Sequence, residues 1–322
     1  MLKYSELKEA SDLYGNNQWI PFDSKSSFDI FKKIYQNKET FGDIFKELFV
    51  GLQTSNDKLY VLTKTGENTY KVPLTEKEYE LEQDLFKPFL LGRDVHRYCE
   101  LSTNRYVFFP YTVENGQAQI IPIKVIKEKY PLTYNYLMEN EKAFKARESG
   151  KAGKLEHWYA YIYPKNLAKF EQPKLSSMEI CSLGMNVTLN YENMYHATTV
   201  YSWVKNESVT APYEYFMVLA NSSLFWWFLK LTGDTLQGDA RRTKTNYIAP
   251  FPLPTATETQ QQELANLATL MMEAVKKQQN AKSEQEKNVC KMRVEAIDAQ
   301  INTKVYALYG LSAEEVAIVE GK

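Results

Sequence analysis

The pattern of apolar and polar positions divides the chain into a long region of short segments and a C-terminal pair of helices. Apolar side chains recur at helical spacing over 264–275 and again over 290–308, and the polar segment KKQQNAKSEQEK separates the two runs. This pattern predicts two antiparallel helices. Ser312 and Glu315 have the spacing of a capping box, which predicts one more helical turn near the C-terminus.

Upstream of residue 250, short runs of β-branched and aromatic residues alternate with turn-forming residues, which favours a β-rich region. We expect strands within 59–62, 69–72, 86–91, 105–111, 120–123, 187–191 and 198–203. Helical periodicity or capping-box spacing predicts two short helices over 28–49 and further helices over 76–85, 126–147 and 213–231. The sequence therefore predicts an α+β fold with a C-terminal antiparallel helical hairpin.

Two composition changes suggest domain boundaries. Residues 1–27 are polar and irregular, as is typical of a linker or an N-terminal extension. The segment PFPLP at 250–254 is a rigid extended spacer. We expect a central domain over 28–249 and a helical hairpin over 250–322, which would brace the domain or dock it to a partner.

Composition limits the classes of partner. The 322 residues are 44% hydrophobic, which is sufficient for a packed core, and the net charge of −1 creates no global positive field, so any nucleic-acid interface must be local. The three cysteines are odd in number and far apart, which indicates a reducing cytoplasm and excludes a disulfide framework. Polar residues interrupt the apolar stretch 213–231, so we expect a buried helix and no membrane span.

A Gly-Arg-Asp turn follows the apolar run at 86–91 and is the first candidate site. Gly92 permits a sharp turn, and Arg93 and Arg97 lie four residues apart around Asp94. A guanidinium can pair with a phosphate or with the Hoogsteen edge of guanine. Alternatively, Asp94 neutralises the two arginines in a surface loop.

Two further cationic segments are candidates for nucleic-acid contacts. The segment KAFKARESGKAGKLEHWY combines flexible cations with aromatic rings, although it could equally be a solvated basic loop. Its candidate residues are Arg147, Lys151, Lys154, His157, Trp158 and Tyr159. The second segment contains Arg241, Arg242 and Lys244 beside hydroxyl groups, and here the arginines could instead complement the carbonyls of a helix end.

The sequence contains no recognisable active site. Glycine-rich cofactor loops, a zinc-protease motif and a nucleophile elbow are all missing, and the three histidines are not at metal-ligand spacing. We therefore expect neither catalytic residues nor a metal site in this chain.

Several separated segments coincide with one family, in the family's own order. Trp19 comes first, followed by GLQTSNDKLYVL for the pattern G-x-x-T-G-N-D-x-x-F-V-I and FKPFLLGRDVHRY for L-K-P-x-I-x-G-R-D-I-x-R-Y. Later pieces are Phe109-Pro110-Tyr111, the Arg147 and Trp158-Tyr159 region, Gln172-Pro173-Lys174, LANSSLFWWFLK, the arginine-containing loop before PFPLP, and IDAQINTKVYALYGLSAEEV. The chain thus resembles the TaqI-like C-terminal specificity domain of adenine-specific DNA methyltransferases and of fused type II restriction-modification enzymes. Ser55 departs from the family, which usually has glycine there.

The resemblance implies a twisted β-rich target-recognition platform whose loops face the major groove of double-stranded DNA. It implies that Gln53, Thr54 and Asn56 read bases or form turns. It also implies contacts with DNA by the following residues: Arg93, Arg97, Arg147, Lys151, Lys154, His157, Trp158, Tyr159, Lys174, Arg241, Arg242 and Lys244. Asp94 would orient the neighbouring arginines. The resemblance also implies a methyltransferase domain or subunit as partner, which would bind S-adenosylmethionine; no cofactor is expected in this chain.

Two functions therefore compete at this stage. The first is sequence-specific recognition of double-stranded DNA by a non-catalytic domain. The second is an assembly module that docks a methyltransferase or nuclease subunit through the helical pair and has little DNA affinity of its own. An enzyme with an unfamiliar site is a distant third, because no constellation of titratable residues emerges.

Overall fold

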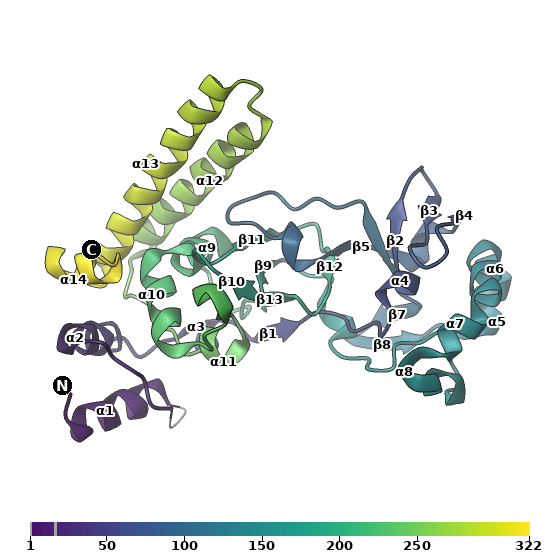
Figure 1. Ribbon diagram of the computed structural model, residues 1–322, viewed down its shortest axis with the longest axis horizontal. Coiled ribbons are helices and arrows are strands. Elements are labelled where there is room, and N and C mark those ends of the chain that lie inside the picture. The colour runs from purple at the N-terminus through teal and green to yellow at the C-terminus, as the bar shows by residue number, and fades with distance from the viewer. Residues whose placement is uncertain (1, 16–17) are drawn as a thin grey trace.

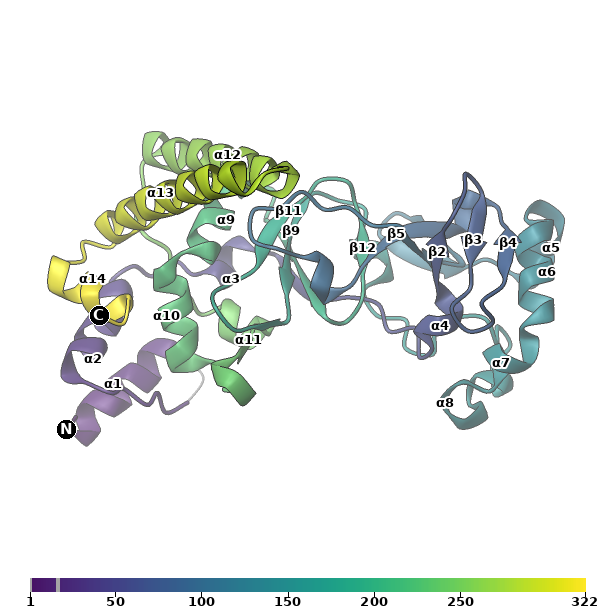
Figure 2. The same ribbon diagram turned by 45° about the horizontal axis from the view of Figure 1, so that its top comes forward.

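The protein consists of two lobes arranged along its long axis, each with its own hydrophobic core (Figure 1). The computed structural model describes residues 2–15 and 18–322. Both chain ends belong to the first lobe, from which a long helical hairpin projects (Figures 1 and 2). The mixture of helices with several small sheets confirms the expected α+β fold.

The first lobe packs helices against a four-stranded antiparallel sheet. The sheet has the order β1 (Glu47–Val50), β13 (Val200–Val204), β9 (Lys174–Met178) and β11 (Val187–Asn190). The helices are α1 (Tyr4–Tyr14), α2 (Lys25–Ile34), α3 (Phe41–Ile44), α9 (Tyr213–Asn221), α10 (Ser223–Thr232), α11 (Thr245–Ile248) and α14 (Ala313–Val319). Beside the sheet lies a two-stranded ribbon of β10 (Ile180–Cys181) and β14 (Arg241–Arg242). Alternating sheet residues, such as Trp203 and Leu175, enter the core.

The second lobe is built on a six-stranded sheet. Its order is β12 (Tyr195–His196), β5 (Phe86–Leu90), β6 (Arg105–Phe108), β2 (Val61–Lys64), β3 (Thr69–Lys71) and β4 (Glu78–Glu80), and only the β12–β5 pair is parallel. A small hairpin, β7 (Tyr111–Glu114) and β8 (Gln117–Ile120), lies beside it. Short helices complete the lobe: α4 (Asp57–Tyr60), α5 (Ile123–Lys129), α6 (Pro131–Glu139), α7 (Glu141–Lys145) and α8 (Arg147–Gly150).

The projecting hairpin consists of α12 (Glu258–Asn280) and α13 (Glu284–Leu308), as expected from their periodicity. Capping boxes at Thr257 and Ser283 satisfy the first backbone N–H groups of the two helices. The expected last turn is α14, which begins with the Ser312–Glu315 capping box. Core residues of the first lobe come from both sides of residue 250, and the division into 28–249 and 250–322 stays a prediction.

Three expected helices differ in the structure. Residues 78–80 form strand β4 instead of a helix over 76–85, because Tyr79 pairs with Tyr70 of β3 and a turn at Glu76 (φ 58°) precedes it. The expected helix over 126–147 is divided into α5, α6 and α7, with Pro131 at the start of α6. The buried helix over 213–231 is two helices, because Ser222 leaves the helical conformation and caps α10.

The expectation of an irregular segment was wrong for residues 4–14, whereas the turn expected at Asn16 and Asn17 lies outside the described residues. Residues 4–14 form α1, and Ala10, Tyr14 and Ile20 are buried in the core of the first lobe. The ring of Tyr14 packs against that of Phe228 at 6.1 Å. Contacts with distant parts of the chain thus order a segment whose own composition is polar.

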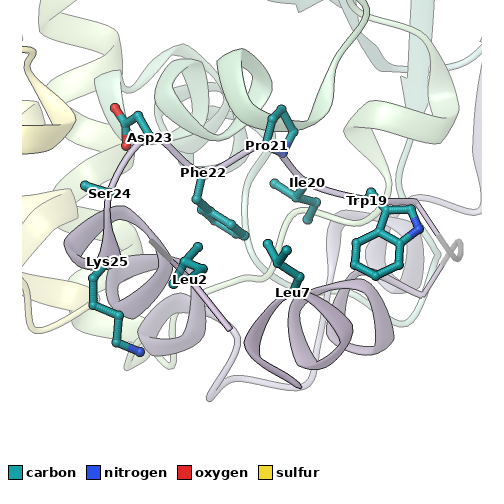
Figure 3. Close-up of a pocket in the computed structure, with 9 residues that line it drawn as sticks. All are labelled: Leu2, Leu7, Trp19, Ile20, Pro21, Phe22, Asp23, Ser24 and Lys25. Atoms are coloured by element: carbon teal, nitrogen blue, oxygen red, sulfur yellow. The ribbon is translucent and has the colours of Figure 1, made fainter. Parts of the chain in front are cut away.

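A hollow of about 580 Å³ lies between α1 and the segment leading to α2, and Figure 3 shows the side chains around it. Its walls are mainly apolar, with Leu2, Leu7, Ile20 and Phe22 facing one another. The residues that line the hollow all lie within 2–25 and so precede every candidate DNA contact in the sequence. None of the helices in the described residues is both long and apolar enough to cross a membrane.

Candidate nucleic-acid interface

The candidate segments are joined by backbone contacts that converge on residues 197–199. Gly92 donates its N–H to Thr199 Oγ1 at 2.9 Å, and Leu52 donates its N–H to the carbonyl of His196 at 2.8 Å. Thr199 also accepts from the N–H of Glu179, whose own carbonyl accepts from Thr243. We use the name loop band for residues 51–56, 92–97, 147–154, 197–199 and 241–244. Segments far apart in the sequence are therefore connected within one structure.

Gly51 is required where the loop band is most closely packed. A Cβ atom at this position would lie 2.1 Å from the carbonyl oxygen of His196 and 2.3 Å from that of Ala197. Both contacts are with backbone, which cannot rotate away. The glycine therefore permits the close approach of the 51–56 and 197–199 segments.

Arg147 connects two segments of the loop band, 147–154 and 51–56, through a buried hydrogen bond. Its side chain is 3% exposed, and its guanidinium donates to the carbonyls of Phe144, Thr54, Trp158 and Ala160 at 2.6–3.2 Å. Since these acceptors occupy its donors, we correct its predicted role: Arg147 binds the protein's own backbone, not DNA. Burial is the main cause that lowers the pKa of its guanidinium.

The aromatic residues predicted beside Arg147 also belong to the core. Trp158 and Tyr159 are buried, and the hydroxyl of Tyr159 donates to the carbonyl of Ile121 at 2.6 Å. His157 is half-buried against the ring of Tyr159. Trp158 and Tyr159 are therefore corrected to structural roles, whereas Lys151 and Lys154 are exposed on the turn that follows Arg147. Backbone φ angles of 48° at Glu148 and 54° at Ser149 bend the chain there.

The two arginines around Asp94 have different surroundings. Arg93 is exposed and, in the described part of the chain, forms no ion pair. Arg97 reaches the helical hairpin, where it pairs with Asp298 at 2.5 Å and donates to the carbonyl of Asn221 at 2.8 Å. The predicted role of Arg97 as a DNA contact is therefore corrected. Arg97 connects the loop band to the helical hairpin through its ion pair with Asp298.

Asp94 does not orient its neighbouring arginines as predicted. It accepts from the N–H of Leu91 at 2.7 Å and pairs with Arg105 on β6. The carboxylate therefore fixes the turn that presents Arg93. Arg105 was not recognised from the sequence because it is eleven residues away and becomes a neighbour only through the β5–β6 pairing.

Two more predicted contacts are buried cations. Lys174 is fully buried on β9, where its ammonium donates to the carbonyls of Phe170 and Gln172, and burial lowers its pKa to about 7. Arg241 is buried and donates to Asp239 and to the carbonyl of Ala240. Both are corrected to structural roles, because both are buried and the Lys174 ammonium and the Arg241 Nη groups already donate to partners within the protein.

The neighbours of Arg241 are closer to solvent. Arg242 is half-buried and pairs with Glu179 at 3.3 Å. Lys244 is half-buried at the edge of a hollow of about 660 Å³ that Tyr201 and Asn246 also line. These two cations remain able to approach a ligand from solvent.

The 51–56 segment combines a turn former with two exposed or half-buried amides. Thr54 is buried, pairs with Asp57 through its hydroxyl and accepts from the N–H of Asn56 at 3.2 Å, so its role is to form the turn. Ser55 has φ 63°, a conformation that favours glycine and matches the glycine expected from the family pattern. Gln53 is exposed and Asn56 is half-buried, so their amides are available to a ligand.

A buried polar layer beneath the loop band was not predicted. His196 contacts Ser202 through Nε2 at 2.5 Å, Asn190 donates to Ser176 at 3.0 Å, and Thr188 donates to the carbonyl of Cys99 at 2.5 Å. All five of these side chains are at most 1% exposed. Burial lowers the pKa of His196 to about 3, so its imidazole is neutral. The only signal in the sequence was the unusual density of hydroxyl and amide groups in 174–202.

The structure thus separates the predicted cations into two groups. Arg97, Arg147, Lys174 and Arg241 hold the frame together. Arg93, Lys151 and Lys154 are exposed, and Arg242 and Lys244 are half-buried. Within residues 2–15 and 18–322, His, Cys, Asp and Glu form no group of three or more that could hold a metal ion.

No protein-family model matches the sequence. Among solved structures, the chain is similar to the type IIL restriction-modification enzyme MmeI, solved in complex with DNA, with 13% sequence identity, a TM-score of 0.58, and 88% of this chain and 36% of that chain covered. It is also similar to the type IIG restriction endonuclease BpuSI, with 10% identity, a TM-score of 0.46, and 89% and 34% covered. The chain spans little more than a third of either protein. The likeness to MmeI shows that this chain has a fold found within a restriction-modification enzyme.

Proposed function

We propose that this chain is the part of a restriction-modification enzyme that recognises double-stranded DNA. The observation that carries the proposal is the loop band, in which hydrogen bonds hold exposed and half-buried cations and amides from four separate segments on one frame. The shared fold adds support, because the similar structure of MmeI was solved in complex with DNA. The TaqI-like sequence pattern independently suggests a target-recognition domain.

Some of the available side chains can contact the phosphate backbone of DNA, and others can contact the edges of its bases. Arg93, Lys151, Lys154 and Lys244 supply positive charge for phosphates, which position a protein on the duplex without reading its sequence. The Gln53 amide can address a base edge as both donor and acceptor. Since the net charge is −1, binding must depend on these local cations and weaken strongly with salt.

The proposed partner is a methyltransferase domain or subunit that binds S-adenosylmethionine and methylates adenine. This part of the proposal comes from the family pattern. A base that is methylated must leave the stack, which favours two protein surfaces that hold the duplex from different sides. The isolated chain should therefore bind DNA more weakly than the complete enzyme.

One observation favours assembly as a second candidate function. Val289 and Met292 are 62% and 69% exposed on α13, three residues apart and therefore on the same side of the helix. Exposed apolar side chains of this kind are typical of a protein-docking face. This function and DNA recognition are compatible, because the two surfaces use different residues.

Selection from a randomised duplex pool at low salt tests DNA recognition. The unsubstituted chain should enrich one sequence family, and the double variant Arg93→Ala, Lys154→Ala should bind the enriched duplex about tenfold or more weakly. The matched control is Lys8→Ala, Lys38→Ala, which removes the same two charges at exposed positions outside the loop band. Absence of enrichment, or equal losses in both double variants, would overturn the proposal.

A further inference from the structure

An exposed leucine forms the tip of the short loop between β10 and β11. Leu183 is 98% exposed, more than any other large hydrophobic side chain in the described residues. Its neighbours Ser182 and Gly184 complete the tip, and Gly184 has φ 135°, which few other residues adopt. The loop therefore presents Leu183 fully to solvent, with Ile180 at its start 41% exposed.

The base of this loop is firmly held although its tip is not covered. Cys181 and Met185, which flank the tip, are 2% and 1% exposed and belong to the core of the first lobe. Asn186 accepts from the N–H of Arg97 at 3.2 Å through its side chain and from the N–H of Met178 at 3.1 Å through its carbonyl. Leu183 is thus displayed by anchored backbone, and the loop is directly bonded to the loop band.

Backbone hydrogen bonds connect the start of the loop to two segments of the loop band. Ile180 at its start is paired across the ribbon with Arg242, and the carbonyl of Glu179 accepts from the N–H of Thr243. The N–H of Glu179 in turn donates to Thr199, which holds the turn of Arg93. The loop that carries Leu183 is therefore linked to the segments that carry Arg93 and Arg242, although the guanidinium of Arg242 is itself paired with Glu179.

We propose that Leu183 inserts as an apolar wedge between two base pairs of the bound duplex. This inference rests on the proposed function. Leucine is among the side chains that separate base steps in this way, because its branched end can replace the apolar contact between stacked bases. A protein-docking surface normally requires a contiguous apolar patch of several hundred Å². Here the exposed apolar side chains are Leu183 and Ile180, on a short ribbon that is bonded to the loop band. The arrangement fits a duplex better than a protein partner.

The test uses the full chain and the duplex enriched from the random pool, with 2-aminopurine placed at successive positions. The unsubstituted protein should raise the fluorescence at one step, because the probe brightens when it is unstacked. Leu183→Ala should abolish that rise and weaken binding by about tenfold, while Leu183→Met should retain both. Leu132→Ala is the control, since Leu132 is 44% exposed on α6 and lies outside the loop band.

Three results would overturn the inference in distinguishable ways. Tight binding with no fluorescence rise at any position would mean that no step is opened. A loss of affinity in Leu183→Ala that is reproduced by replacing one thymine with uracil would instead assign Leu183 to a thymine methyl group in the groove. Failure of the unsubstituted chain to bind any duplex would overturn the proposed function, and the wedge with it.

Discussion

The helical hairpin and the loop band keep their shapes by different kinds of contact. In α12 and α13, buried apolar residues such as Met271 and Ile301 hold the helices together, and capping boxes complete the helix starts. In the loop band, short segments are held by hydrogen bonds from Arg147 and Thr199 and by the close approach at Gly51. Apolar packing is non-directional, whereas these hydrogen bonds fix each loop at a defined place.

This difference leads to different consequences of substitution. A change in the hairpin core should reduce stability without moving the loops that carry Arg93 and Lys154. A change in the frame of the loop band should reduce both stability and DNA affinity, because the exposed side chains lose their support. Comparing the two regions therefore separates stability from recognition.

The largest expected effect is in the hairpin. Ile301 is fully buried, so Ile301→Ala should lower the free energy of unfolding by about 2–5 kcal/mol through lost burial and a residual cavity. Urea denaturation measures this loss. The affinity of the protein that remains folded for the enriched duplex should be unchanged. A parallel loss of affinity would show that the hairpin core also positions the loop band.

A comparable effect is expected at Arg147. Arg147→Ala leaves the buried carbonyls of Thr54 and Trp158 without their donor and should cost about 2–3 kcal/mol in urea denaturation. Unlike Ile301→Ala, it should also weaken DNA binding, because the 51–56 and 147–154 segments lose their connection. Arg147→Lys is the matched control, since it retains the charge but cannot reproduce the fork of donors. Full DNA affinity in Arg147→Ala would contradict the proposed role of the frame.

The next effect concerns pH and the layer beneath the loop band. Burial, with a smaller contribution from the neighbouring Lys174, lowers the pKa of His196 to about 3. Because the unfolded histidine binds a proton near pH 6.5, stability is present above pH 6.5 and is lost as the pH falls toward 3. Between pH 6.5 and pH 5 the free energy of unfolding should fall by about 2 kcal/mol.

Urea denaturation across this range tests the titration of His196. His196→Gln should lose less stability on acidification than the unsubstituted protein. The same pH dependence in both proteins would refute the assignment.

A smaller effect is expected where the two regions meet. Arg97 and Asp298 form a partly exposed ion pair between the loop band and α13, so a double-mutant cycle with alanine should give a coupling energy of about 1 kcal/mol. The coupling should decline at high salt. A coupling near zero would mean that the hairpin does not stabilise the turn of Arg93 through this pair.

The success of sequence-based prediction also differs between the two regions. The apolar spacing from Leu264 to Leu308 predicted both long helices, because a helix depends on contacts between residues three or four apart, and the capping-box spacing of Ser312 and Glu315 predicted α14. The β4 strand was missed because the local capping-box pattern of Thr75 and Glu78 was overridden by pairing with β3. Local patterns therefore sufficed only where local contacts determine the structure.

The candidate site was predicted in part for the same reason. The sequence identified the cationic segments, whose contact with DNA stays a prediction, but it could not separate exposed Arg93 from Arg97, which is paired with Asp298 of α13. Nor could it show that Arg147 and Lys174 are buried among backbone carbonyls. An arginine that contacts DNA and one that supports a loop are chemically the same residue, and only tertiary contacts distinguish them.

The central claim is that exposed cations of the loop band contact DNA whereas paired and buried cations build the frame. The dependence of the binding constant on salt concentration tests it most directly, in the unsubstituted chain, Arg93→Ala and Arg97→Ala. The logarithmic slope should become shallower by about 1 in Arg93→Ala and should stay unchanged in Arg97→Ala, whose guanidinium is engaged by Asp298. A shallower slope in Arg97→Ala, together with an unchanged slope in Arg93→Ala, would contradict the account.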